Sequence, residues 1–227
     1  ETALKASANY EVKSSYAFTV VATNTAVPAL FAEKSVTVGV TDVNDVDPVF
    51  TSGDTGSVSE NADASTAIYT AVAVDGDGTA VNRAVTYSIK PGVGDADLVA
   101  IDASTGVVTL KAPANFEAKS SYSISVTATD NGTPTLSATR DVAVTVTNVN
   151  EAPTDITLSV TSVASNTAAG TAVGTLGAVD PDAGSSFTYA LVAGSAGSDA
   201  DNSLFTISGD QLLLASGAVL NRSTNPT

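Results

Sequence analysis

Apolar and polar residues alternate along many short stretches of this chain. The pattern is clearest in residues 16–20, 36–40, 122–126 and 142–146, where every second side chain is apolar. A period of two is that of a β-strand with one buried face. Frequent Gly, Asn, Asp and Pro turn signals separate the stretches, and none of them carries a helical stripe. The pattern therefore predicts an all-β protein built of antiparallel β-sandwiches.

One sequence occurs twice. ANYEVKSSYAFTVVATN at residues 8–24 returns as ANFEAKSSYSISVTATD at residues 114–130, and the offset of 106 residues holds without a gap from Asn9 to Asp45. A repeat of this length is a whole sandwich domain and not one turn of a solenoid. The chain is therefore predicted to be a slice of a tandem array.

The repeat divides the chain into three predicted segments. Residues 1–47 are the C-terminal part of one repeat with about two strands, residues 48–152 are a complete repeat, and residues 153–227 are the N-terminal part of a third with about five strands. Residues 1–47 are predicted to hold the strands that the incomplete repeat at residues 153–227 lacks. Either the chain is a fragment of a longer protein, or like chains join head to tail by strand complementation, because an open half-sandwich exposes strand edges. Sedimentation of the isolated chain distinguishes these interpretations.

Composition narrows the function. The 24 acidic and 9 basic residues give a net charge of −15, which disfavours nucleic acid and anionic membrane surfaces as partners. The absence of Cys and His removes disulfides, thiol nucleophiles and soft metal ligands. No apolar run reaches the roughly 20 residues of a membrane span, so no membrane insertion is expected. The acids lie beside turns at the predicted domain ends and not in one cleft, so we expect no enzyme.

Acidic and amide side chains recur at equivalent points of successive repeats. The first junction, around Pro48, carries Asn9, Glu11, Asn44, Asp45, Asp47, Asp75, Asp77 and Asp130. The second junction, around Pro153, carries Glu60, Asn115, Glu117, Asn150, Glu151, Asp180 and Asp182. Carboxylates gathered this closely repel one another unless a cation lies between them. Calcium, which takes six to eight oxygen ligands in flexible geometry, suits such a set better than magnesium.

These motifs resemble those of cadherin repeats, in the bacterial cadherin-like form of large surface adhesins. DVNDVDPVF at residues 42–50 is similar to the family linker DxNDNxPxF, and SEN at residues 59–61 to its xEN element. Asp75-Gly76-Asp77 resembles DxDxG, and Asn9-Tyr10-Glu11 resembles DRE with its first Asp replaced. The resemblance implies Greek-key, immunoglobulin-like sandwiches of about 105 residues. It also implies up to three Ca²⁺ ions between successive repeats.

The resemblance implies a ligand set for each junction. In the first, Asn9, Glu11 and Asp45 would surround the upper ions with Asp77, and Asn44, Asp75, Asp77 and Asp130 would hold the third with the carbonyls of Val43, Val46 and Asn82. In the second, the ligands would be Glu60, Asn115, Glu117, Asn150, Glu151, Asp180 and Asp182.

This sequence also departs from the family pattern. The upstream glutamate of the first junction would precede residue 1, and Asn9 and Asn115 lower the ligand charge. Ser165 and Ser223 stand where Glu60 and Glu117 stand one repeat earlier, so a junction after the third repeat is expected to bind calcium weakly and to bend.

The predicted function is that of an extracellular, cell-surface stalk or fibre segment, which interdomain Ca²⁺ stiffens. Its partners would be neighbouring repeats of the same protein or like chains joined head to tail. The alternative from another class is a recognition module that binds a glycan or a partner cadherin-like domain. A surface mutation away from the junctions that abolished cell or glycan binding would favour that alternative.

Overall fold

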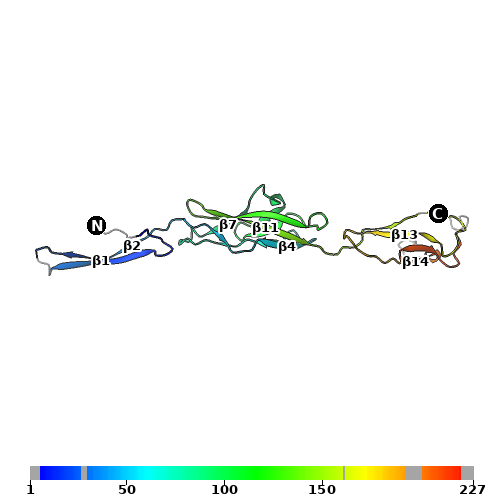
Figure 1. The fold of residues 1–227 in the computed structure, drawn as a ribbon, viewed down its shortest axis with the longest axis horizontal. Coiled ribbons are helices and arrows are strands. Elements are labelled where there is room, and N and C mark those ends of the chain that lie inside the picture. Colours follow the sequence, from blue (N-terminus) through cyan, green and yellow to red (C-terminus); the bar gives the residue numbers. More distant parts are fainter. Residues whose placement is uncertain (1–5, 27–29, 161, 193–200, 221–227) are drawn as a thin grey trace. The chain divides into compact units, whose positions relative to one another are not determined.

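The computed structural model describes residues 6–26, 30–160, 162–192 and 201–220. Its contacts divide the chain into two compact units, residues 1–149 and 150–227. Strands dominate both (Figure 1), and helical structure in the described ranges is limited to the short 3-10 helices η1 (Ala96–Leu98) and η3 (Asn202–Leu204). Neither helix could cross a membrane. The predicted all-β class is confirmed, whereas the predicted repeat boundaries stay predictions.

Residues 48–149 form a β-sandwich. One sheet has four strands in the order β4, β11, β10 and β7, which are Thr55–Ser59, Ser137–Thr147, Ser121–Asp130 and Val85–Ile89. The opposite layer has the strands β5, β9 and β8, which are Ala67–Thr70, Val107–Leu110 and Val99–Ile101. The pair of β3 (Val49–Phe50) and β6 (Ala73–Val74) completes the sandwich. All of these pairs are antiparallel except β4–β11, which is parallel.

The core lies between these layers and follows the alternation of the sequence. In β11 the side chains of Val142, Val144 and Val146 are buried, whereas the residues between them are exposed. The facing strands add Ile68, Val99, Val108 and Leu110. Burial of one strand face is thus what selects this register, since a shift by one residue would expose the valines.

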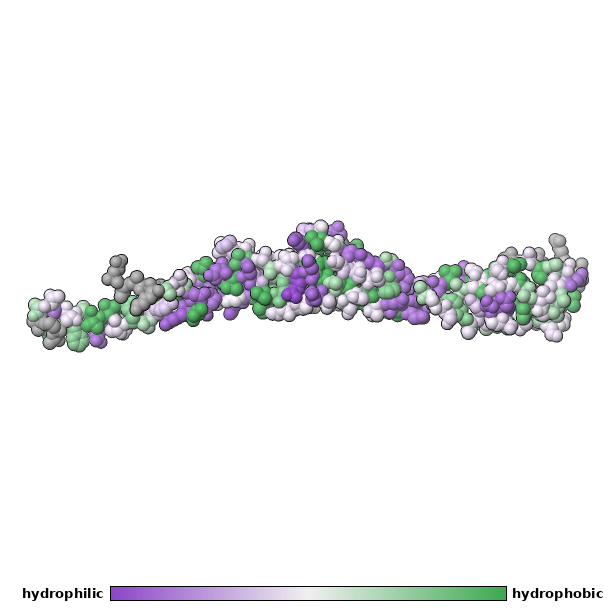
Figure 2. Space-filling model, in the orientation of Figure 1, coloured by the Kyte–Doolittle hydropathy of each residue, from purple (hydrophilic) through white to green (hydrophobic). Residues whose placement is uncertain are grey.

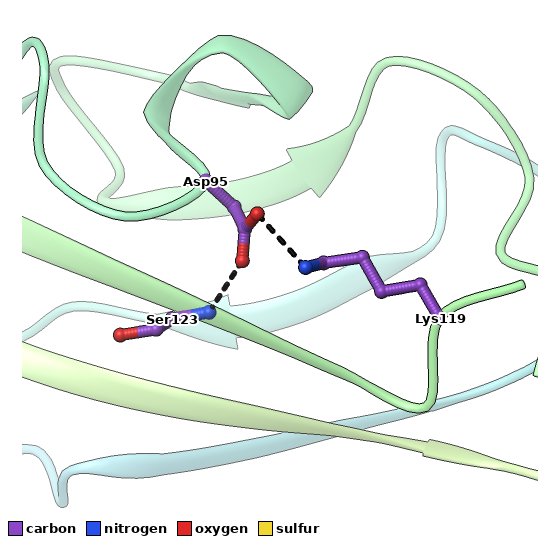
Figure 3. Close-up of polar contacts among 3 residues, drawn as sticks. All are labelled: Asp95, Lys119 and Ser123. Atoms are coloured by element: carbon purple, nitrogen blue, oxygen red, sulfur yellow. Dashed lines mark hydrogen bonds and ion pairs between the residues drawn. The ribbon is translucent and has the colours of Figure 1, made fainter.

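Asp95 precedes η1 and fastens this turn to β10. Its carboxylate accepts a hydrogen bond from the Ser123 N–H at 2.9 Å and lies 3.0 Å from the Lys119 ammonium (Figure 3). Burial alone would raise the pKa of Asp95, but the Ser123 hydrogen bond and the Lys119 charge outweigh it and lower the pKa. This contact is structural and lies outside the acidic groups described below.

A two-stranded hairpin precedes the sandwich within the same unit. β1 (Ser15–Thr23) and β2 (Phe31–Gly39) pair in the register of β10 and β11, so that Tyr16 faces Val38 as Tyr122 faces Val144. The packing differs, however. Val144 is fully buried, whereas Val38 is 49% exposed. Figure 2 shows apolar surface along this hairpin. In β10 and β11 the equivalent face is buried under a second layer of strands, but no second layer covers the hairpin in the described residues.

This pair of equivalent valines gives a matched test of the core. Val144→Ala is expected to destabilise the sandwich by about 2 kcal/mol, because it removes buried methyl groups and leaves a cavity. Val38→Ala should change the stability by less than about 0.5 kcal/mol, as exposed substitutions do. Urea unfolding of both variants at low protein concentration checks this. Equal losses of stability would contradict the described packing.

The second unit has four described strands. They are β12 (Asp155–Leu158), β13 (Ala172–Val179), β15 (Gln211–Leu214) and β14 (Phe205–Ser208), paired antiparallel in that order. The sequence predicts about five strands for residues 153–227. Residues 187–191 align with β7 but form no strand, and the equivalent of β10, with which β7 pairs in the first unit, lies outside the described residues.

One turn of this unit has the same local geometry as a turn of the sandwich. Asn61 and Asn166 both adopt positive φ angles, 59° and 62°. Their N–H groups donate to the carbonyls of Ala114 at 2.9 Å and Leu220 at 3.2 Å. The same turn therefore forms at equivalent positions in both units.

Candidate metal centres

The linker between β2 and β3 is fixed to two loops at one end of the sandwich. The Asn44 amide is buried and donates to Asp130 Oδ2 at 3.0 Å and to the Pro134 carbonyl at 2.7 Å. The Asp45 N–H donates to Asp77 Oδ1 at 3.4 Å, a long contact. The linker thereby brings its polar side chains to the loop after β6 and to the end of β10.

Glu11, Asp45 and Asp77 form the first carboxylate group. One oxygen from each lies within 4.8 Å of the other two. Glu11 lies in the turn before β1, Asp45 comes from the linker, and Asp77 comes from the loop after β6. Glu11 and Asp45 are exposed, whereas Asp77 is only 2% exposed. The group therefore joins the segment before the sandwich to the sandwich itself.

Asp75, Asp77 and Asp130 form the second group, again with oxygens within 4.8 Å. Asp130 ends β10 and is 1% exposed. Its carboxylate accepts hydrogen bonds from the N–H groups of Gly132 and Leu136, each at 3.0 Å. These bonds fix the Asp130 carboxylate in place, and Asp77 belongs to both groups.

The second group concentrates negative charge in a buried place. No salt bridge among the described residues reaches Asp75, Asp77 or Asp130. Burial raises the pKa of Asp75, and the charges of Asp77 and Asp130 raise it further. At an effective dielectric constant of 20, like charges about 4 Å apart repel by roughly 4 kcal/mol. Among the described residues, hydrogen bonds stabilise these carboxylates but no salt bridge offsets their repulsion.

Buried oxygens without hydrogen-bond partners occur at the same place. Among the described residues of the first unit, these atoms are Asp42 Oδ1, Asn44 Oδ1, Asp75 Oδ2 and Asp77 Oδ2. A buried polar atom without a partner costs about 1–3 kcal/mol, so a cluster of four calls for an explanation. All four atoms are oxygens, which are the ligand atoms that a hard cation prefers. The residues present therefore fit the predicted Ca²⁺.

Asp42 is not among the predicted ligands, although its Oδ1 is one of these buried oxygens. Its Oδ2 accepts hydrogen bonds from the Thr79 N–H at 2.8 Å and from Asn82 Nδ2 at 3.0 Å. Burial would raise the pKa of Asp42, but hydrogen bonds with Thr79, Glu11 and Gly78 outweigh burial and lower the pKa. The available signal was its place as the first residue of the linker motif. Asn82 uses its side chain here, and its carbonyl stays the predicted ligand.

Asn9 and Asn115 use their side chains locally. Asn9 Oδ1 accepts a hydrogen bond from the Val12 N–H at 2.8 Å, and Asn115 Oδ1 accepts one from the Ala118 N–H at 2.6 Å. Each oxygen therefore caps the turn that follows it. Their role as cation ligands stays a prediction.

Glu60 and Glu117 lie at the other end of the sandwich. Glu60 is buried, and its two oxygens accept the N–H groups of Phe116 and Val149, each at 2.8 Å. Glu117 is exposed. The Glu60 carboxylate thus ties the segment after β9 to the segment after β11.

The second unit repeats the acidic loop of the first. The Asp182 N–H donates to Asp180 Oδ1 at 2.9 Å, as the Asp77 N–H donates to Asp75 Oδ1 at 2.8 Å. The Glu151 N–H donates to Asp182 Oδ2 at 2.6 Å, and Asn150 Nδ2 donates to the Glu151 carbonyl at 3.1 Å.

Beyond this loop the two repeats differ. Ser165, which stands where Glu60 stands one repeat earlier, is exposed. Ser223, which stands where Glu117 stands, lies outside the described residues. The expected weak calcium binding after the third repeat therefore stays a prediction.

The raised pKa of Asp75 predicts a pH-dependent cation affinity. Below that pKa the carboxyl is protonated, so the repulsion from Asp77 and Asp130 falls and the cation loses one ligand charge. Calcium affinity should therefore fall as pH decreases through the raised pKa and recover above it. Calorimetric titration between about pH 7 and 4 checks this. Asp75→Asn should bind more weakly but show a flatter profile, and identical profiles for both proteins would contradict the prediction.

Sequence comparisons identify relatives. Residues 54–147 match the model of the cadherin domain. The chain is 36% identical over 178 residues to Protein dachsous of Drosophila melanogaster, which covers 77% of this chain and 5% of that protein. It is 33% identical over 144 residues to human Protocadherin-1, which covers 63% of this chain and 14% of that protein. The chain thus spans a small part of the curated relatives that it matches.

Solved structures agree with this. PcdhgB3 EC1-4 matches with a TM-score of 0.73 and 25% identity over 98% of this chain and 53% of that chain. Mouse Cadherin-23 EC22-24 matches with a TM-score of 0.53 and 33% identity over 63% of this chain and 45% of that chain. The predicted fold of tandem cadherin-like sandwiches is confirmed.

These relatives come from animals, so the predicted bacterial origin stays a prediction. Cadherin domains are extracellular modules that generally bind Ca²⁺. The family match, the relatives and the fold lead to one conclusion: the chain is built of cadherin repeats, and residues 54–147 are a cadherin domain.

Proposed function

We propose that this chain is a calcium-binding structural segment of an extracellular cadherin-type protein, in which bound Ca²⁺ stiffens the connection between successive repeats. The observation that carries this proposal is the pair of carboxylate groups that share Asp77. They contain Glu11 and Asp45 from the segment before the sandwich and Asp75 and Asp130 from the sandwich itself. Bending at this point would separate the ligands.

The position of each residue decides which of two ions it would bind. Glu11, Asp45 and Asp77 would hold one ion across the junction. Asp75, Asp77 and Asp130 would hold a second, and the partnerless Oδ1 of Asn44 supplies a further oxygen. The cation supplies positive charge that turns the repulsion among these carboxylates into attraction. The Asn44 hydrogen bonds already hold one point of the linker on the sandwich, which lowers the cost of ordering the remaining ligands when the cation binds.

The expected affinity suits the extracellular space. Extracellular calcium modules bind with a Kd of about 10⁻⁴–10⁻³ M. Millimolar external calcium would therefore fill such sites, whereas the low concentration inside cells would not. The function needs no catalytic group.

Small-angle X-ray scattering with calcium and with a chelator tests this role. The maximum dimension of the wild-type chain should vary with calcium, because without the ion the like charges at the first junction allow it to bend. Asp75→Ala/Asp77→Ala should resemble the chelated wild type under both conditions. A wild-type profile that calcium leaves unchanged would count against the stiffening role.

Exposed apolar faces favour a second candidate, a fibre subunit that joins like chains head to tail. Phe18, Val20 and Val38 of the hairpin are 44–49% exposed, although the equivalent β10 and β11 side chains are buried. Ile156 and Val179 of the second unit are also exposed. The hairpin is the repeat equivalent of β10 and β11, and these two strands cover such an apolar face in the complete sandwich.

Sedimentation velocity tests this second candidate. Head-to-tail joining predicts species larger than the monomer at micromolar concentration, and Val20→Asp should abolish them because it places a charge on the exposed face. Asp141→Asn, on an exposed position of β11, is the control and should leave them unchanged. A well-folded wild-type monomer would rule out the polymer.

A further inference from the structure

The first junction also contains contacts that involve no carboxylate. Tyr10, from the segment before β1, lies against Gly78 in the loop after β6. A Cβ added at Gly78 would overlap Cδ1 and Cε1 of the Tyr10 ring and would lie 3.4 Å from its Cζ. Gly78 does not adopt a positive φ angle, so its backbone does not demand glycine. Room for the ring is the physical reason why glycine fits here.

A second glycine in the same loop takes a second apolar side chain. A Cβ added at Gly76 would lie 3.1 Å from Cγ1 of Val46, which is tighter than an ordinary contact. Val46 comes from the linker, and both Val46 and Tyr10 are half-buried. Two apolar side chains from before the sandwich therefore lie on two glycines that flank Asp77.

From these contacts we propose that Tyr10 on Gly78, supported by Val46 on Gly76, is an ion-independent latch that limits bending at the first junction when no cation is bound. Contact of a half-buried aromatic ring with a loop is favourable by burial alone. This contact opposes the mutual repulsion of Glu11, Asp45 and Asp77. The proposal concerns the cation-free state, so it stands or falls separately from calcium binding.

The sequence of the second unit lacks both glycines. Pro181 and Ala183 stand where Gly76 and Gly78 stand one repeat earlier, although Phe116 keeps an aromatic ring at the position of Tyr10. Ala183 carries the Cβ for which the first loop has no room. The latch is therefore a property of the first junction in this chain.

Pulsed electron resonance distances in the full chain test the latch. The chain has no cysteine, so spin labels attach only to two introduced cysteines, Thr19→Cys and Thr139→Cys. Both positions are exposed and lie on strands. The measurement is made in a chelator on wild type, Tyr10→Ala and Gly78→Ala. Tyr10→Phe keeps the ring. Gly53→Ala is the matched control, because a Cβ at Gly53 meets nothing within 4 Å.

Loss of the ring should raise the population of bent conformers about five-fold, the change that roughly 1 kcal/mol makes in an equilibrium constant. Gly78→Ala should do the same, and Tyr10→Ala/Gly78→Ala should be no worse than Tyr10→Ala alone, since both remove one contact. Tyr10→Phe and Gly53→Ala should match the wild type. An unchanged distance distribution in Tyr10→Ala, or additive effects in the double variant, would overturn the latch.

A calcium arm of the same experiment separates the two proposals. If calcium narrows the distribution of distances between the two labels in Tyr10→Ala, the stiffening role stands, whatever the measurement in chelator shows. If calcium narrows it in no variant, the stiffening role fails, and the chelator arm still decides on the latch.

Discussion

Replacing Asp77 by asparagine is expected to weaken calcium binding at the first junction by on the order of 100-fold, which corresponds to about 2.7 kcal/mol. Asp77 is the residue that both carboxylate groups share, and its Oδ2 is buried without a hydrogen-bond partner. Asparagine keeps the size of the side chain but removes one negative charge. Two ions should therefore be affected by a single substitution.

Isothermal titration calorimetry of the full chain measures this loss directly. The matched control is Asp97→Asn, which removes a charge of the same kind from an exposed position outside both groups. It should leave the affinity within about two-fold of the wild type, because exposed charges are screened by salt. Equal effects of the two substitutions would mean that the net charge of −15, and not the described geometry, governs binding.

The second large effect concerns heat stability. Calcium at about 100 times its Kd is expected to raise the melting temperature of the sandwich by roughly 10 °C or more. The ligands Glu11, Asp45 and Asp130 lie far apart in the unfolded chain and converge only in the fold. A cation therefore binds the folded form, which mass action then stabilises by about 2.7 kcal/mol per site.

Differential scanning calorimetry with calcium, and with sodium chloride at the same ionic strength, checks this expectation. Simple screening of the acidic chain would give equal shifts with both salts. Asp77→Asn should lose most of the calcium-specific shift and keep the small sodium effect. A wild-type shift that sodium reproduces in full would contradict specific binding.

The regular parts of the fold could be predicted because they depend on local patterns. Every second residue is apolar at positions 122–128 of β10 and 142–146 of β11, and the repeat at residues 8–24 relates the hairpin to these strands. The parallel pair β4–β11 could not be predicted. β4 is only Thr55–Ser59, too short and too polar to show a periodic pattern, and its pairing depends on how the chain passes between sheets.

The candidate site was predictable to a similar degree. Spacing identified Asp45, Asp75, Asp77 and Asp130, because the linker and the loops meet at one end of a sandwich. Spacing could not show that Asn9 caps its own turn, since local hydrogen bonds depend on the backbone path. The contact of Tyr10 with Gly78 also could not be predicted, because it joins residues from separate segments. A glycan or partner surface stays a prediction.

A crystal structure of the chain grown in ample calcium would show directly whether the two carboxylate groups hold cations. Density with an anomalous calcium signal is expected between Asp75, Asp77 and Asp130 and between Glu11, Asp45 and Asp77. Each ion should have six to eight oxygen ligands at about 2.3–2.6 Å. Water in both places, with these carboxylates turned away from one another, would mean that the junction is not a calcium site.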